Sequence, residues 1–126
     1  MSIENRVVIG SSMYPFYKNG EIVPVKNSCK KFIIGNCYLF SYKNTTYIHR
    51  LYKKHKNSLQ LIGDNSNRVQ IVNTEKVIAE PVVQTNYISR ILIALVNIFF
   101  VTNSPTTYVR NYIRRRIIRI LLLILN

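Results

Sequence analysis

Short runs of apolar or alternating residues, separated by turn residues, make up the first two thirds of the chain. The clearest separators are Lys43-Asn44 and the basic stretch 53–58. Short strands joined by Asn, Gly and Lys turns predict a mainly β domain, a small sheet or barrel. The first nine residues are expected to form an edge strand. The further strands are expected at residues 22–25, 32–34, 38–42, 46–52, 59–62, 69–72 and 77–78.

The pattern changes near residue 86, and two helices are expected beyond it. Residues 88–101 are apolar, with an uninterrupted core of about 11 residues, or roughly 16 Å, against a bilayer core of roughly 30 Å. This segment is too short to span a membrane alone. We therefore expect a β catalytic domain at residues 1–86 and a C-terminal, basic and apolar helical appendage at 87–126.

The second expected helix is amphipathic. Val109, Ile113, Ile117, Ile120 and Ile124 fall on one face, and Arg110, Arg114, Arg115 and Arg119 fall on another. Its start is predicted at Ser104-Pro105, a capping serine followed by proline at the first helical position. The alternative to a membrane-facing helix is one packed on the domain with its arginines in solvent.

The charge points to an anionic partner. The formal net charge is +13, and the chain from Arg90 onward holds six Arg and no acid among many Ile and Leu. Basic and apolar residues together favour a membrane surface. Nucleic acid is not expected as a partner, because aromatic residues are few near these arginines. Residues 1–6 are short and polar, so no N-terminal signal is expected. We expect a membrane-associated protein, peripheral or anchored through its C-terminal helices.

The cysteines and histidines do not form a metal-binding pattern. Cys29 and Cys37 are not arranged as Cys-x-x-Cys, and no matching histidine pair accompanies them. Two unpaired thiols are favoured over a disulfide. His55 lies in a basic turn. No metal and no cofactor is expected.

A serine follows the first strand. Residues 7–9 lead into Gly10-Ser11-Ser12-Met13-Tyr14-Pro15, which places Ser12 where a strand ends and an irregular turn begins. A turn exposes a hydroxyl while the neighbouring strand holds it still, which suits a nucleophile. A serine before a Met-x-Pro turn is more often only a turn residue, so this stretch alone does not favour catalysis.

Three later stretches strengthen the catalytic interpretation. Gly20-Glu21-Ile22-Val23 follows the serine, the run His49-Arg50-Leu51 lies within an alternating strand, and Gly63-Asp64-Asn65 follows a further strand. The order resembles the type I signal peptidase family, whose blocks run Gly-x-Ser-Met-x-Pro, Gly-Asp-x-Val, a base followed by Arg-Val, and Gly-Asp-Asn. The resemblance covers roughly residues 7–83. Glu21 stands where that family has aspartate, and the family's usual N-terminal anchor is not expected here.

The resemblance implies roles for individual residues. Ser12 matches the nucleophile, and His49 occupies the position of the base, as in the endoplasmic-reticulum and archaeal branch. Asp64 is the default candidate to orient the imidazole. The histidine branch takes its third member a few residues later, where this chain has Val69 and Gln70. Three alternatives stay open: Asp64 orients His49, the site is a Ser-His dyad, or the protein is an inactive homologue.

The oxyanion site is expected to have fewer hydrogen-bond donors than in some members of that family. Some relatives place a serine two residues before the nucleophile, and here that residue is Gly10. The backbone N–H of Ser12, with the Ser11 hydroxyl, would then stabilise the oxyanion.

The sequence therefore predicts a serine endopeptidase that cleaves a leader or signal peptide after small residues by Ser-His acyl transfer. One alternative is a catalytically inactive homologue that binds a peptide strand without cutting it. Another is a repressor-type relative that cuts itself. Such relatives normally carry a helix-turn-helix ahead of the peptidase domain and rely on a lysine base.

Overall fold

The computed structural model describes residues 2–27, 31–101 and 108–125 of the 126-residue chain. Its elements are β1 (Ile3–Val7), β2 (Ile22–Lys26), β3 (Cys37–Tyr42), β4 (Thr45–Lys54), β5 (Ser58–Ile62), β6 (Val69–Asn73), a short 3-10 helix (Thr74–Lys76), β7 (Val77–Pro81), α1 (Tyr87–Phe100) and α2 (Tyr108–Leu125). The prediction of a mainly β domain with a helical appendage is confirmed. Residues 32–34 were expected as a strand and are not one. The Ile33 amide instead donates to the Tyr38 hydroxyl at 2.7 Å.

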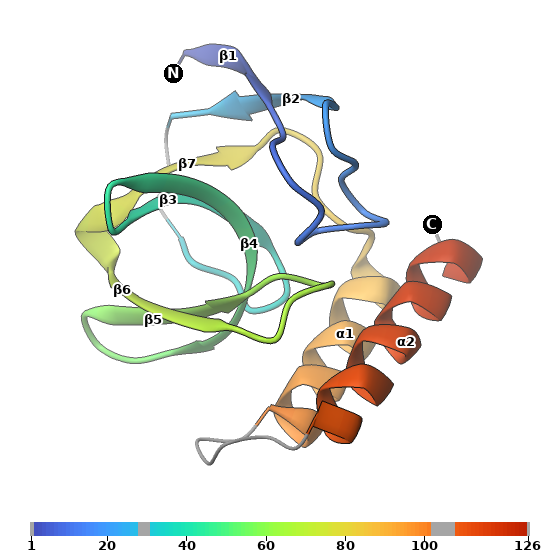
Figure 1. Ribbon diagram of the computed structural model, residues 1–126. Helices are drawn as coiled ribbons and strands as arrows, with labels where there is room; N and C mark the ends of the chain where they lie inside the picture. Colours follow the sequence, from blue (N-terminus) through green and yellow to red (C-terminus); the bar gives the residue numbers. More distant parts are fainter. Residues whose placement is uncertain (1, 28–30, 102–107, 126) are drawn as a thin grey trace.

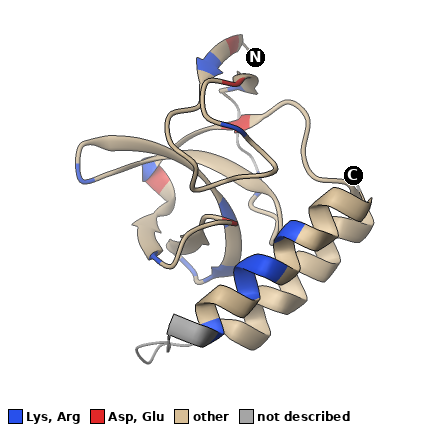
Figure 2. Cartoon of the chain, turned by 45° about the vertical axis from the view of Figure 1, so that its right-hand side comes forward, with Lys and Arg blue, Asp and Glu red and all other residues tan. Residues whose placement is uncertain are grey.

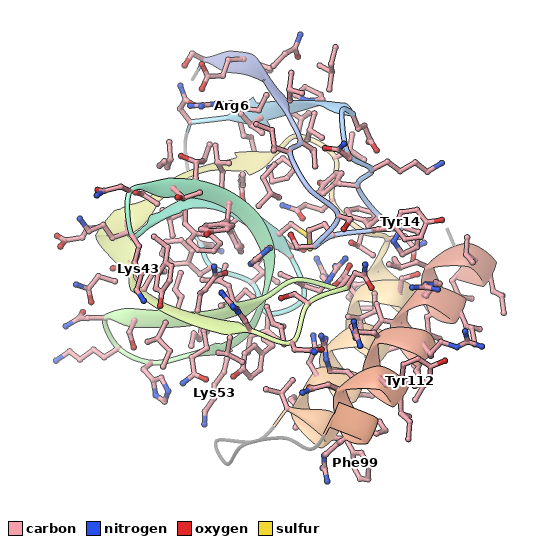
Figure 3. All side chains as sticks on the ribbon, in the orientation of Figure 1. Arg6, Tyr14, Lys43, Lys53, Phe99 and Tyr112 are labelled. Atoms are coloured by element: carbon pink, nitrogen blue, oxygen red, sulfur yellow. The ribbon has the colours of Figure 1, made fainter. Side chains whose placement is uncertain are left out.

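The strands form one antiparallel sheet in the order β1-β2-β7-β3-β4-β5-β6. As expected, the first strand lies at an edge. The last strand, β7, inserts between β2 and β3 and so joins the N-terminal hairpin to the rest of the sheet. Strands β3 to β6 curl strongly (Figure 1), and side chains fill the space that they enclose (Figure 3).

The turn between β3 and β4 fixes the register of the central hairpin. Lys43 and Asn44 have φ values of 48° and 63°, the left-handed conformation that a two-residue hairpin turn requires at both positions. Asparagine tolerates that conformation better than most residues. The register places His49 opposite Tyr38.

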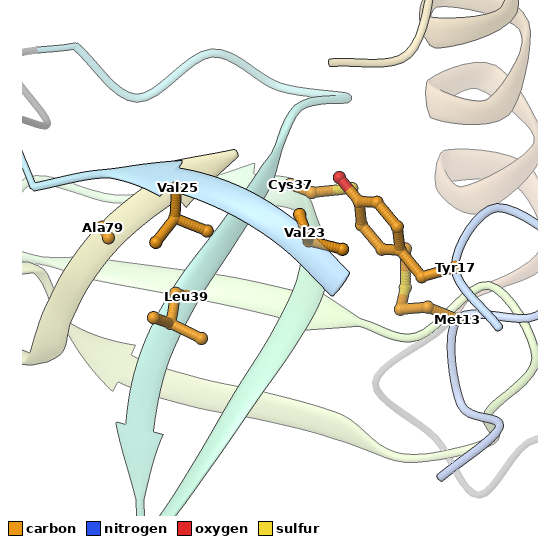
Figure 4. Packing of buried hydrophobic residues seen from close by; sticks show 7 residues of the cluster. All are labelled: Met13, Tyr17, Val23, Val25, Cys37, Leu39 and Ala79. Carbon is orange, nitrogen blue, oxygen red and sulfur yellow. The ribbon is translucent and has the colours of Figure 1, made fainter. Parts of the chain in front are cut away.

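Alternation along the strands divides the core in two, because successive side chains point to opposite faces of a sheet. Leu39 and Cys37 contribute to one buried cluster, whose members are drawn in Figure 4. Tyr38 and Phe40 contribute to the other, with Leu51, Leu59, Leu61 and Val72. Consecutive residues of β3 therefore contribute to different clusters.

The helices α1 and α2 form an antiparallel hairpin beside the sheet (Figure 1). Ile93, Ile118 and Leu122 are buried where the two helices pack. The Asn86 side chain caps α1 by accepting from the Ser89 amide at 2.9 Å. The predicted start of the second helix at Ser104-Pro105 lies outside the described residues.

The orientation of α2 differs from that of an ordinary packed helix. Arg114 is fully buried, whereas Ile113, Ile120 and Ile124 are exposed. The alternative in which this helix packs through its apolar face and leaves its arginines in solvent is therefore wrong for Arg114. No helix in the described ranges is long and apolar enough to cross a bilayer. Figure 2 shows the basic residues of the hairpin, with the acidic residues confined to the β domain.

Candidate active site

Ser12 lies in the irregular segment that follows β1. The next residue, Met13, is buried in the first core cluster beside Tyr17 (Figure 4), and its carbonyl accepts from the Tyr17 amide at 3.0 Å. Gly10 has a φ of 91°, which favours glycine there, and its amide donates to the Asn19 side chain at 2.9 Å. Burial of Met13 thus anchors the segment and leaves the Ser12 side chain at the surface of the cluster.

His49 reaches Ser12 from the middle of β4. The Ser12 hydroxyl lies 2.9 Å from His49 Nε2, within hydrogen-bond reach although 37 residues separate the two. The imidazole is buried, with the rings of Tyr47 and Phe40 centred 5.4 and 5.8 Å away. The structure therefore brings together the hydroxyl and the imidazole that the sequence singled out.

Gln70, from β6, holds the far side of the imidazole. Its Oε1 lies 2.5 Å from His49 Nδ1. An amide oxygen only accepts, so Nδ1 carries the proton and Nε2 keeps a lone pair for the Ser12 hydroxyl. Burial lowers the pKa of His49, although the hydrogen bond to Gln70 and the field of Asp64 oppose this change. The neutral ring is the form that accepts a proton.

Asp64 does not occupy the place that the sequence suggested, and this corrects the expectation that it orients His49. Its two oxygens accept from Arg50 Nε at 2.7 Å and from Arg50 Nη2 at 2.6 Å, and both side chains are fully buried. Arg50 also donates to the Gly35 carbonyl and to Thr85 Oγ1, each at 2.7 Å. His49 and Arg50 are consecutive in β4, so they face opposite sides of the sheet. The carboxylate lies on the side of the arginine.

The turn at residues 63–66 supports Ser12 directly. The Asn65 amide donates to the Ser12 carbonyl at 2.8 Å, and the Asn65 side chain donates to the Ser11 carbonyl at 3.1 Å. A Cβ on Gly63 would lie 2.5 Å from the Ser12 carbonyl oxygen and 3.2 Å from His49 Nε2. Only glycine fits at this close approach, because any side chain would push the serine and histidine apart.

Two pockets flank Ser12. One has a volume of about 200 Å³ and a mostly apolar lining that includes Val8, Met13, Leu39 and Ile48. The other has a volume of about 420 Å³ and contains the imidazole, with Tyr42, Lys43, Tyr47, Ser66, Arg68, Val69 and Gln70 around it. The Ser12 hydroxyl therefore lies between two pockets, one apolar and the other polar and basic.

The remaining candidate groups form no second centre in the described ranges. Three or more His, Cys, Asp or Glu side chains do not gather at any point there as a metal site would require. Cys37 is a buried free thiol, and burial raises its pKa to about 12, which makes it a poor nucleophile. Cys29 lies outside the described residues.

One functional residue was not recognised from the sequence. Gln70 stands at the spacing where the resemblance predicts an acid, and an amide partner for the imidazole is not part of that pattern. Its position at the spacing of the third member, within an alternating strand, is the signal that the sequence offers.

A family model described as Peptidase S24-like matches residues 6–82. That range includes the end of β1, all of β2 to β7, and Ser12, His49, Asp64 and Gln70. Comparisons with curated proteins and with solved structures found no match.

Proposed function

We propose that this chain, which belongs to the Peptidase S24-like family, is a serine endopeptidase that cleaves a leader or signal peptide by acyl transfer. The observation that carries the proposal is the 2.9 Å contact between Ser12 Oγ and His49 Nε2, with Gln70 on the opposite nitrogen. A nucleophile, a base and a group that orients the base are the parts that acyl transfer requires.

The reaction follows from these contacts. His49 Nε2 takes the hydroxyl proton as Ser12 Oγ attacks the peptide carbonyl, and an acyl-enzyme forms when His49 returns the proton to the leaving amine. Water then attacks the acyl group with His49 again as base. Gln70 keeps the imidazole in the productive tautomer throughout. As a neutral partner it stabilises the imidazolium less than a carboxylate would.

The oxyanion would be stabilised by the backbone N–H of Ser12 together with the Ser11 hydroxyl. The hydrogen bonds from Asn65 to the carbonyls of Ser11 and Ser12 hold this segment in place. Donors that are fixed before the reaction require no reorganisation when charge develops on the carbonyl oxygen.

The substrate would lie extended along the apolar pocket, whose lining includes residues 7–9 and residues 46–48. An extended peptide can add to a sheet edge such as β1. Since His49 must reach the leaving amine, the polar pocket takes the residues after the cut bond and the apolar pocket takes those before it. A hollow of about 200 Å³ suits a small apolar side chain, as expected for a leader peptide.

A defined peptide set tests this proposal. The full chain is incubated with peptides that differ only at the residue before the intended bond (Ala, Val, Phe or Asp), and products are identified by mass spectrometry. We expect cleavage after Ala or Val and none with the Ser12→Ala or His49→Ala variants. Peptides that bind equally to the wild-type chain and the Ser12→Ala variant, and stay intact with both, would identify an inactive peptide-binding homologue instead.

We also propose that the helical hairpin rests on an anionic membrane surface. Six large apolar residues of α1 and six of α2 are exposed, and the Arg110 guanidinium lies 5.8 Å from the centre of the exposed Phe99 ring. These residues are Tyr87, Ile88, Ile91, Leu95, Ile98 and Phe99 on α1, and Tyr112, Ile113, Ile120, Leu123, Ile124 and Leu125 on α2. Phe99 projects away from the sheet (Figure 3). Apolar contacts with a basic fringe are typical of helices that lie in a membrane interface.

Liposome flotation tests the membrane proposal. We expect the full chain to float with vesicles that contain anionic lipid, and to float less once Leu95→Ser and Leu123→Ser are combined. A matched double variant, Ile71→Ser with Ile78→Ser, removes exposed apolar residues from the sheet and should float normally. Equal flotation of all three proteins would reject this surface.

A further inference from the structure

Arg114 is a fully buried cation at the contact between α2 and the turn at residues 63–66. Its Nη2 donates to the carbonyls of Gly63, at 3.2 Å, and of Ser66. Its Nη1 donates to Asn97 Oδ1 of α1 at 2.8 Å. Within the described ranges the ion pairs are Arg6–Glu4, Lys26–Glu80 and Arg50–Asp64, so no carboxylate pairs with Arg114.

Helix packing alone does not require this arginine. Burying a charge is costly without a counterion, and neutral oxygens compensate only in part. Arg114 Nε is buried without a hydrogen-bond partner. Burial also lowers the pKa of the guanidinium to about 10. An apolar side chain of similar length would fill the same space at lower cost. The position therefore depends on what the guanidinium binds.

The guanidinium binds the segment on which Ser12 rests. Gly63 and Ser66, whose carbonyls it holds, bracket Asn65, which donates to the carbonyls of Ser11 and Ser12. Gly63 also lies in close approach to Ser12 and His49. A shift of this turn would therefore move the serine relative to the imidazole.

We propose that Arg114 is a positioning residue for the Ser12–His49 pair, which makes the helical hairpin part of the catalytic unit. The inference rests on the proposed function for its effect on rate, but its effect on the turn is independent of catalysis. It acts through the turn at residues 63–66 and touches neither Ser12 nor substrate.

Two readouts on the full chain test it. The first is the rate at which a fluorophosphonate labels Ser12, and the second is the hydrogen-exchange rate of the Asn65 amide, which donates to the Ser12 carbonyl. We compare the wild-type chain with Arg114→Met and with Arg116→Met, an exposed residue of the same helix. A displacement of about 1 Å near a reacting group can cost about a hundredfold in rate. We expect Arg114→Met to slow labelling at least tenfold and to accelerate Asn65 exchange, with Arg116→Met unchanged in both.

Arg114→Lys keeps the proposal testable if Arg114→Met does not fold. Lysine can still donate to the two carbonyls but cannot reproduce the planar fork that also reaches Asn97. We expect labelling and exchange rates between those of the wild-type chain and Arg114→Met. For Arg114→Ala, added guanidinium at millimolar concentration should partly restore the labelling rate of Ser12 and the protection of the Asn65 amide.

The outcomes separate the two proposals. Wild-type labelling and exchange rates in a folded Arg114→Met variant overturn the positioning role. Slower labelling with a fully protected Asn65 amide overturns it as well, because the loss would not pass through the turn. An unlabelled wild-type chain contradicts the proposed peptidase function, and Asn65 exchange then still decides whether Arg114 holds the turn.

Discussion

Two fully buried arginines hold the same turn from different sides and with different partners. Arg50 binds both oxygens of Asp64, whereas Arg114 binds the carbonyls of Gly63 and Ser66 and the Asn97 amide oxygen. Burial on its own lowers the pKa of both. The Asp64 carboxylate reverses this for Arg50, whose pKa is raised, while the pKa of Arg114 stays lowered at about 10.

The two arginines therefore have different roles: one stabilises the fold, and the other positions the active-site turn. A buried ion pair that is fully hydrogen-bonded tolerates no loss of one partner, because the remaining charge has nothing to neutralise it. A buried cation held by neutral oxygens costs the fold something even when it is intact. Arg50 therefore belongs to the core of the β domain, and Arg114 belongs to the active-site turn. His49, with the Gln70 amide as its partner, follows the pattern of Arg114.

The largest expected effect comes from breaking the ion pair. Arg50→Met or Asp64→Asn leaves one uncompensated buried group, and we expect a loss of about 3–5 kcal/mol in the free energy of unfolding, measured by urea denaturation. The double variant should recover part of that loss, because both charges are then gone. A loss below about 1 kcal/mol in either single variant would contradict the assignment of this pair to the core.

Arg114→Met should cost less stability. It takes the guanidinium donor from the Ser66 carbonyl and from Asn97 Oδ1, at about 1–3 kcal/mol, whereas the Gly63 carbonyl still accepts from the Ser66 amide. It also removes a charge that was costly to bury. We expect a net loss of about 1–2 kcal/mol by the same urea measurement. Arg116→Met is the control and should change stability by no more than about 0.5 kcal/mol. A loss as large as that of Arg50→Met would erase the contrast between the two arginines.

Replacing Gln70 by glutamate would place a carboxylate beside His49 and change how the labelling rate depends on pH. Because burial lowers the pKa of His49, the base stays neutral, and the rate should hold, to below its ordinary pKa of 6.5. Gln70→Glu favours the imidazolium and should move the acid limb of fluorophosphonate labelling to higher pH, by about one unit or more. An acid limb that does not move would exclude residue 70 as the partner of the imidazole.

The same shift predicts how stability depends on pH. The unfolded chain binds the histidine proton near pH 6.5, whereas the folded chain binds it only at lower pH. The wild-type protein should therefore lose stability as pH falls from 6.5 toward the folded pKa of His49. Gln70→Glu should reduce that loss. Urea titrations between pH 5 and 8 compare the two slopes, and equal slopes would contradict the lowered pKa.

The smallest effect is expected at a partly exposed ion pair. Lys26 and Glu80 lie 3.3 Å apart between β2 and β7, with exposed fractions of 33% and 16%. Solvent screens such pairs, so Lys26→Met should cost about 0.2–1 kcal/mol in urea denaturation. A cost near that of breaking Arg50–Asp64 would mean that burial does not decide the strength of these pairs.

The central hairpin and the two helices could be predicted from the sequence, because both depend on local residue patterns. Alternating strands around Lys43-Asn44 predicted the central hairpin, because few residue pairs tolerate the left-handed conformation that its turn requires. The change of pattern near residue 86 predicted the helices. The order of strands in the sheet was not readable, since β7 inserts between β2 and β3 through contacts distant in sequence.

The candidate site was readable only in part, for two physical reasons. The resemblance pairs Ser12 with His49 and offers Asp64 as the orienting acid. Alternation along β4 instead directs Arg50 toward that carboxylate and His49 to the other side of the sheet. The second reason concerns α2. Helical periodicity separates an arginine face from an apolar face, but it does not say which of them the domain buries. Arg114 was therefore expected at a lipid surface, whereas it lies buried against the turn.

Mass spectrometry of the intact chain after exposure to a fluorophosphonate tests the proposed Ser12–His49 chemistry most directly. The account predicts a single adduct on Ser12 at neutral pH, and its loss in His49→Ala. The absence of an adduct between pH 6 and 9, or an undiminished adduct in His49→Ala, would contradict it.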